Sequence, residues 1–298
     1  MDGDSDVTAQ VLSALLVLVL SAAAVGAVVR GRTLAQRVEA RPDGRVWLYR
    51  NFVLRMWPLM VLPLLLAWAS SRVTTADLGW ARPHGVVGYL LAAYYLLVVT
   101  IACFRVRGRM RRGVVFARRQ RVAFMVPRTA RERWWVVALS LTAGITEEAL
   151  FRGALLAVGV KIYHLPYLAT ALAAVLLFAV GHLYQGWAGL IGSALVGSVF
   201  AVLYALSGSL LLPILVHASH DLISLLLIPA TSTPQPPTPQ PPSAQSPTAQ
   251  PPTAQLTSPP ATSTPKTVEP SGTTAPTPTF PRPAFPDGPP TVRTAVPD

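Results

Sequence analysis

Charged residues are scarce in this chain: of its 298 residues only 13% are Asp, Glu, Lys or Arg. A soluble globular domain carries about 25%. With 52% hydrophobic residues and a mean hydropathy of +0.45, the composition argues against a soluble enzyme and for a membrane protein. Cysteine is nearly absent as well. Cys103 is the single one, so no disulfide can form within the chain.

Sequence features of several other protein classes are also missing. The chain has no glycine-rich nucleotide-binding loop and no nucleic-acid-binding module. Its net charge of +12 therefore does not by itself indicate a nucleic-acid partner. The first apolar run is preceded by acidic rather than basic residues, which is not typical of a signal peptide, so we expect a retained helix.

Long apolar segments dominate what is present, and seven are long enough to cross a bilayer. They cover approximately Val7–Val29, Phe52–Ala69, Val86–Phe104, Trp134–Val158, Leu165–Leu183, Ala188–Leu206 and Leu210–Ile228. We expect an all-α fold, a polytopic transmembrane helix bundle of about seven spans, with eight as the alternative. The protein is expected to be a multi-pass protein of the cell membrane, with the lipid bilayer as a partner.

The arginines predict the orientation of these spans. Residues 30–50 contain six arginines and residues 105–133 contain eleven, whereas residues 70–85 contain only Arg72 and Arg82. Because cytoplasmic loops are enriched in Lys and Arg, we expect both basic segments in the cytoplasm and the N-terminus outside. The same charges could instead contact anionic headgroups or an acidic partner.

The composition changes abruptly near residue 228. Residues 229–298 contain 22 of the 29 prolines and few large apolar side chains, so they cannot bury a core. We expect a disordered Pro-rich tail that is extended and semi-rigid. A reader of Pro-rich motifs is a candidate partner for it. Seven spans would place this tail in the cytoplasm, and eight would place it outside.

Two adjacent glutamates lie inside the fourth apolar segment. Glu148 and Arg152 are four residues apart, so on a helix they share a face and can neutralise each other. Glu147 lies about 100° further round the helix and lacks that partner. The spacing thus separates a structural glutamate, Glu148, from a chemical one, Glu147, which suits a general base.

The fifth apolar segment carries a histidine, and the sixth carries small residues. Phe178 and His182 are four residues apart and are expected to stack on one helix face, with Gly181 allowing a neighbouring helix to approach closely. In the sixth segment small residues recur every fourth position, which predicts close helix packing around the site. They are Gly189, Ser193, Gly197, Ala201 and Ala205.

The seventh segment contains two histidines and an aspartate. His217 and Asp221 are four residues apart, so Asp221 could orient the imidazole, or both could face a shared metal or substrate oxygen. His220 lies one turn from His217 and could join them. Polar side chains of this kind are costly inside a membrane and usually mark a functional site.

Together these carboxylates and imidazoles can take a proton from water and stabilise an oxyanion. The chemistry predicts hydrolysis of an amide in a membrane-embedded cavity. Two histidines and a glutamate also make a plausible Zn²⁺ shell, with Glu147, His182 and His217 as candidate ligands.

The three patterns, EExxxR, FxxxH and HxxxN/D, occur in this order over approximately residues 134–228. In this order they resemble the CPBP family, the CAAX proteases and bacteriocin-processing enzymes also called the Abi family. The resemblance implies an intramembrane endopeptidase with Glu147 as the base and His182 helping to hold the attacking water. Arg152 would brace the glutamates, and His217 and Asp221 would occupy the positions that stabilise the oxyanion.

One residue departs from the pattern of the family's eukaryotic prenyl-protein proteases, which have Asn where this chain has Asp221. Asn can donate a hydrogen bond and an ionised Asp cannot. Asp221 is therefore expected to orient His217 or to ligate a metal. The family has been described both as metalloproteases and as glutamate-dependent enzymes, and both mechanisms stay open at this point.

The resemblance divides the chain into three regions. Residues 1–133 are expected to form transmembrane helices with basic cytoplasmic loops, residues 134–228 the protease-like core, and residues 229–298 the tail. The expected substrate is a membrane-associated peptide or protein: a prenylated CAAX end, a bacteriocin leader and a signalling-protein anchor all fit the class. The alternatives are a non-catalytic immunity or scaffold protein on the same fold and a proton-coupled transporter, although no inverted repeat supports the latter.

Straight helices present a difficulty for this site. With 1.5 Å per residue, Glu147 would lie about 20 Å from the cytoplasmic end of its span at Trp134. His182 would lie about 5 Å from the same face. We therefore expect the fourth span to be broken, tilted or to start later than the hydropathy suggests.

Overall fold

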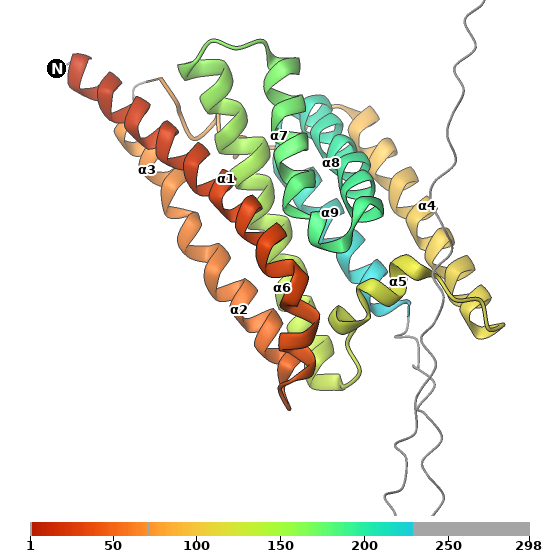
Figure 1. Ribbon diagram of the computed structural model, residues 1–298. Coiled ribbons are helices and arrows are strands. Elements are labelled where there is room, and N and C mark those ends of the chain that lie inside the picture. The colour runs from red at the N-terminus through yellow and green to blue at the C-terminus, as the bar shows by residue number, and fades with distance from the viewer. Residues whose placement is uncertain (1, 71, 229–298) are drawn as a thin grey trace, which may run out of the picture. The chain divides into compact units, whose positions relative to one another are not determined.

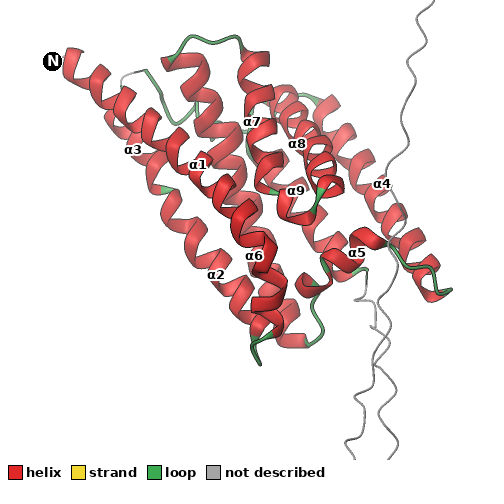
Figure 2. Ribbon diagram, viewed as in Figure 1, coloured by secondary structure: helices red, strands yellow, loops and turns green. Residues whose placement is uncertain are grey.

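A computed structural model describes residues 2–70 and 72–228 of the chain, and every regular element in that part is helical (Figure 2). The predicted all-α fold is confirmed there, and the predicted Pro-rich tail lies outside the described residues. The elements are α1 (Asp2–Glu39), α2 (Gly44–Leu59), α3 (Val61–Ala69), α4 (Val86–Arg111), α5 (Ala117–Arg121), η1 (Ala123–Met125), α6 (Ala130–Glu148), η2 (Ala149–Leu155), η3 (Val158–Ile162), α7 (Tyr167–Gly181), η4 (Leu183–Gln185), α8 (Trp187–Ser207) and α9 (Leu211–Leu226).

Among the residues that the structure describes, four apolar stretches are long enough to cross a membrane, so this is a membrane protein. They are Val7–Gly31, Gly44–Ala69, Val86–Arg111 and Trp187–Ser207. The apolar helices α7 and α9 have only 15 and 16 residues, fewer than the ~20 that usually span a bilayer. The count of about seven spans therefore stays a prediction for α6, α7 and α9.

The helices pack around α6 and α9, which contact each other. Figure 1 shows α1, α2 and α3 on one side of this pair and α8 and α4 on the other. Helix α6 also contacts α2, while α9 also contacts α4 and α8, and α1 contacts α3 and α7. The N-terminal helices thus flank the segment that carries the predicted site.

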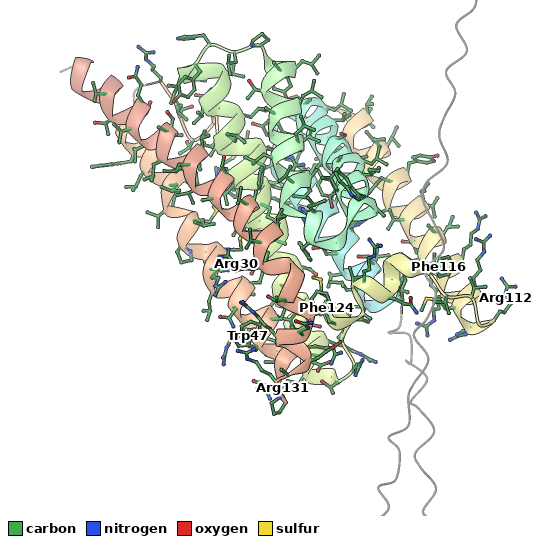
Figure 3. All side chains as sticks on the ribbon, in the orientation of Figure 1. Arg30, Trp47, Arg112, Phe116, Phe124 and Arg131 are labelled. Atoms are coloured by element: carbon green, nitrogen blue, oxygen red, sulfur yellow. The ribbon has the colours of Figure 1, made fainter. Side chains whose placement is uncertain are left out.

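Basic residues gather at the end of the bundle opposite the N-terminus. Figure 3 labels Arg30, Arg112 and Arg131 near that end, together with the aromatic residue Trp47. This arrangement fits the predicted cytoplasmic side, because arginines mark that side and aromatic rings favour the interface.

Two of the basic side chains also hold the C-terminal end of α9. Arg107 donates to the Leu227 carbonyl at 2.8 Å. Arg119 donates to the Ser224 carbonyl at 3.3 Å and also to the Ile228 carbonyl. The last carbonyls of a helix lack intrahelical partners and attract cations. Arg107 and Arg119 therefore do more than fix the topology, because they tie α9 to α4 and α5.

The turn between η3 and α7 places Glu147 and His182 at similar depths, which straight helices did not. Glu147 lies 15 residues before Ile162, where η3 ends, and His182 lies 15 residues after Tyr167, where α7 begins. In an antiparallel hairpin, equal distances from the turn place two residues at the same level. Of the alternatives expected for the fourth span, a later start was wrong, because α6 begins at Ala130, while the α-helix is interrupted after Glu148 by the π-helical segments η2 and η3.

Candidate functional site

A buried ion pair lies at the centre of the site. Arg152 donates through Nη1 to Oε1 of Glu148 at 3.0 Å, and the two side chains are 2% and 0% exposed. The pairing predicted from their four-residue spacing is therefore present. Nη2 of Arg152 donates to the Gly197 carbonyl on α8 at 2.8 Å. Arg152 lies in η2, a π-helical turn that follows Glu148 directly, and such turns are frequent at functional sites.

His217 on α9 lies between three carboxylates. Its Nδ1 donates to Oε1 of Glu148 at 2.8 Å, while its Nε2 lies 3.9 Å from Oε2 of Glu147 and 3.9 Å from Oδ2 of Asp221. A separation of 3.9 Å is too long for a hydrogen bond. The side chain that orients His217 is therefore Glu148 rather than Asp221. The expectation that Glu148 is merely structural is too narrow, because its Oε1 also holds the imidazole.

Glu147 and Glu148 differ in their surroundings although they are neighbours in the chain. Oε1 of Glu148 accepts from Arg152 and His217, whereas its Oε2 and Oε2 of Glu147 accept no hydrogen bond from the described residues. This oxygen is buried, yet the Glu147 side chain as a whole is 12% exposed. Glu147 thus has an acceptor available for a molecule that enters the site.

His182 is the residue that terminates α7. Its Nδ1 donates to the Phe178 carbonyl at 2.9 Å, and its ring lies 4.6 Å from the Phe178 ring, measured between centroids. The predicted contact within the FxxxH pattern is therefore present. The bond at Nδ1 leaves Nε2 for another partner. The same Phe178 ring lies 6.1 Å from the His217 ring between centroids, so it borders both histidines.

Two phenylalanines enclose the charged groups. Phe200 on α8 stacks on His217 at 4.7 Å between ring centroids and 27° between planes. The guanidinium of Arg152 lies 4.8 Å from the Phe178 ring and 5.6 Å from the Phe200 ring. Cation–π contacts of this kind stabilise a desolvated arginine. Phe200 was missed in the sequence, and its spacing three residues after Gly197 was the available signal.

Glycines let the helices that carry the site approach each other. A Cβ on Gly144 would lie 2.9 Å from the Ile214 carbonyl oxygen, so α6 and α9 can meet at this distance only through a glycine. A Cβ on Gly197 would lie 3.1 Å from Nη2 of Arg152, as the predicted small-residue packing requires. The expectation for Gly181 was wrong, because a Cβ there would have no neighbour within 4 Å among the described residues.

The structure separates His220 from the other predicted side chains. Its Nδ1 lies 2.8 Å from the hydroxyl of Tyr95 on α4, and the two rings stack at 5.8 Å between centroids. The suggestion that His220 joins His217 is therefore replaced by a contact with another helix. Tyr95 was missed because no sequence spacing links a residue of α4 to one of α9.

Glu147, His182 and His217 are the candidate zinc ligands that the sequence suggested. No three His, Cys, Asp or Glu side chains within residues 2–70 and 72–228 are arranged to hold one metal ion. Two ligands of a tetrahedral zinc with ~2 Å bonds would be separated by about 3.3 Å. The Glu147 and Asp221 oxygens are each 3.9 Å from Nε2 of His217, and would have to move closer. Zinc binding stays a prediction.

Comparison with known proteins agrees with the resemblance seen in the motifs. Residues 129–223 match the family model described as type II CAAX prenyl endopeptidase, Rce1-like, which confirms the resemblance to the CPBP and CAAX protease family for this segment. Neither a curated protein nor a solved structure matches the chain. The matched segment runs from the residue that caps α6 to the last turns of α9 and contains all six predicted site residues.

Proposed function

We propose that this protein is a glutamate-dependent intramembrane endopeptidase that hydrolyses a peptide bond of a membrane-associated peptide or protein. The observation that supports this most is the environment of His217. Glu148 holds one nitrogen of the imidazole at 2.8 Å, and the other nitrogen faces both Glu147 and Asp221 at 3.9 Å. Polar contacts beyond 3.5 Å are commonly bridged by water. A water held there would be in reach of a base and of a cation.

Glu147 is the proposed general base. Its Oε2 accepts no hydrogen bond from the described residues, so it can accept a proton from the bound water. The water oxygen then attacks the carbonyl carbon of the scissile amide. As the new C–O bond forms, the electron pair of the carbonyl moves to its oxygen and gives an oxyanion. Nε2 of His182 is the second candidate group to hold this water, because Nδ1 is occupied by the Phe178 carbonyl.

His217 is the proposed oxyanion stabiliser. An ionised carboxylate only accepts hydrogen bonds, so the contact with Glu148 places a proton on Nδ1 of His217. When Nε2 is protonated as well, it donates to the oxyanion. The intermediate collapses as the C–N bond breaks, and the leaving amine takes the proton from Glu147. Asp221 would then act by its charge on His217, at 3.9 Å.

The test compares the full-length protein with Glu147→Gln, which keeps the side-chain size but removes the base. Membrane fractions of cells with each variant are compared by proteomics for a peptide that stays uncleaved only in Glu147→Gln. Cleavage of that peptide by the purified variant should fall about 10²–10⁴-fold, the usual contribution of a general base.

Glu132→Gln is the matched control. Glu132 lies on the same helix, where it completes a capping box with Thr129, and Gln serves that box equally well. This variant should cleave like the wild type, and both variants should unfold at the wild-type temperature. Undiminished cleavage by Glu147→Gln would rule out the proposed base.

A further inference from the structure

Tyr95 connects α4 to the helix that carries His217 and Asp221. Its ring packs against an apolar cluster between α4, α8 and α9 that includes Phe200, while its hydroxyl reaches His220. Tyr95 lies outside the segment 129–223 that matches the protease family. Its role therefore has to be read from its contacts.

The first contact fixes His220, the residue next to Asp221. The hydroxyl of Tyr95 lies 2.8 Å from Nδ1 of His220, and the planes of the two rings are 22° apart at 5.8 Å. With the imidazole proton on Nε2, the tyrosine hydroxyl donates to Nδ1. A directional bond and a stacked ring together restrain the imidazole. His220 also interacts electrostatically with Asp221.

The second contact supports His217 from behind. The Tyr95 ring meets Phe200 edge-on, with 6.3 Å between centroids and 78° between planes. Phe200 in turn stacks on the His217 imidazole at 4.7 Å. Tyr95 thus restrains α9 at two points, at His217 through Phe200 and at His220, the residue directly before Asp221.

We propose that Tyr95 is a positioning residue of the active site, contributed by a helix outside the protease-like segment. This inference rests on the proposed function. Tyr95 contacts His220 and Phe200, whereas Glu147 is the group expected to touch the reacting water. Loss of the hydroxyl should therefore leave substrate binding intact and lower the rate of the chemical step.

The adjacent residue offers a matched control. Tyr94 is 66% exposed on α4, so Tyr94→Phe removes the same hydroxyl from the same helix without touching the site. With the peptide that accumulates in Glu147→Gln as substrate, Tyr95→Phe should lower kcat about tenfold and leave KM unchanged, as expected for one lost hydrogen bond. Tyr94→Phe should match the wild type in both parameters.

A double-mutant cycle separates positioning from a general structural effect. If Tyr95 acts through His220, the loss in Tyr95→Phe/His220→Ala should equal that in His220→Ala alone. His220→Asn places an acceptor near the former Nδ1 and should restore part of the rate when Tyr95 is present.

Each outcome distinguishes this inference from the proposed function. If Glu147→Gln still cleaves, both the proposed function and the positioning role of Tyr95 are refuted. If Glu147→Gln is inactive but Tyr95→Phe behaves like Tyr94→Phe, or its loss adds fully to that of His220→Ala, only the positioning role of Tyr95 is refuted.

Discussion

Replacing Arg152 by methionine should strongly destabilise the fold, because the change leaves a buried charge without its counter-ion. Methionine matches the stem of arginine but lacks the guanidinium. Arg152 is 2% exposed and donates to Glu148 at 3.0 Å and to the Gly197 carbonyl at 2.8 Å. Glu148 is 0% exposed and would keep only His217 as a donor. Removing one partner of a buried pair costs about 3–5 kcal/mol.

The assay is equilibrium unfolding of the full-length protein in detergent, with two companion variants. Arg133→Met on α6 removes an exposed arginine and should change the free energy of unfolding by no more than about 0.5 kcal/mol. Glu148→Leu/Arg152→Met removes both charges and should be more stable than Arg152→Met alone, because no unpaired carboxylate is left.

The reasoning would be refuted by either of two results. A loss below about 1 kcal/mol in Arg152→Met would mean that Glu148 is solvated or neutral in the fold. A double variant no more stable than Arg152→Met alone would mean that the two charges are not coupled. Either result would also remove the physical basis for assigning different roles to Glu147 and Glu148.

Two further predictions concern the space beside His182 and the loop before α4. Gly181→Ala and Gly108→Ala fill open helical positions, so each should raise the free energy of unfolding by up to about 1 kcal/mol. Only Gly181→Ala should slow cleavage, because substrate is expected to occupy the space beside His182. Equal cleavage rates for the two variants would contradict this. Burial raises the pKa of Asp77, but hydrogen bonds from Lys161 and Thr74 outweigh it and hold the pKa below 3.8. The folded-state pKa is thus depressed, so the stability contribution is present above pH 3.8 and lost as the pH falls through the folded pKa. The advantage of wild type over Asp77→Asn in the free energy of unfolding, below about 1 kcal/mol at pH 6, should vanish on acidification, and a constant advantage would contradict it.

Local spacing predicted the contacts that lie within one helix. The pairs Glu148–Arg152 and Phe178–His182 are both four residues apart, and both contacts are present at 3.0 Å and at 4.6 Å between ring centroids. Helical geometry alone brings such residues together, so no knowledge of the fold is needed. The same spacing brings Nε2 of His217 to 3.9 Å from Oδ2 of Asp221, but the hydrogen bond that orients the imidazole is made to Glu148 on α6.

Contacts between helices could not be read from the sequence. His220 pairs with Tyr95, which is 125 residues away, and Gly181 faces open space although it resembles a packing glycine. Both outcomes depend on which helices are neighbours and how they are rotated. The relative depth of Glu147 and His182 was misjudged for a related reason, since the helical segment that carries Glu147 runs from Ala130 to Ile162 and extends beyond the expected span at both ends.

The exposed fractions of the side chains show which side of the site is open, which the distances alone do not. The side chains of Glu148, Glu147 and Asp221 are 0%, 12% and 25% exposed, and His217 contacts Glu148 on one nitrogen and faces the other two on the opposite nitrogen. The side of the imidazole that carries Glu147 and Asp221 is therefore the more exposed one. Glu148 cannot exchange roles with Glu147, because it lies on the closed side and its Oε1 is occupied by Arg152 and His217. This difference supports the proposal of Glu147 as the base, because Glu147 faces the open side and its Oε2 accepts no hydrogen bond from the described residues.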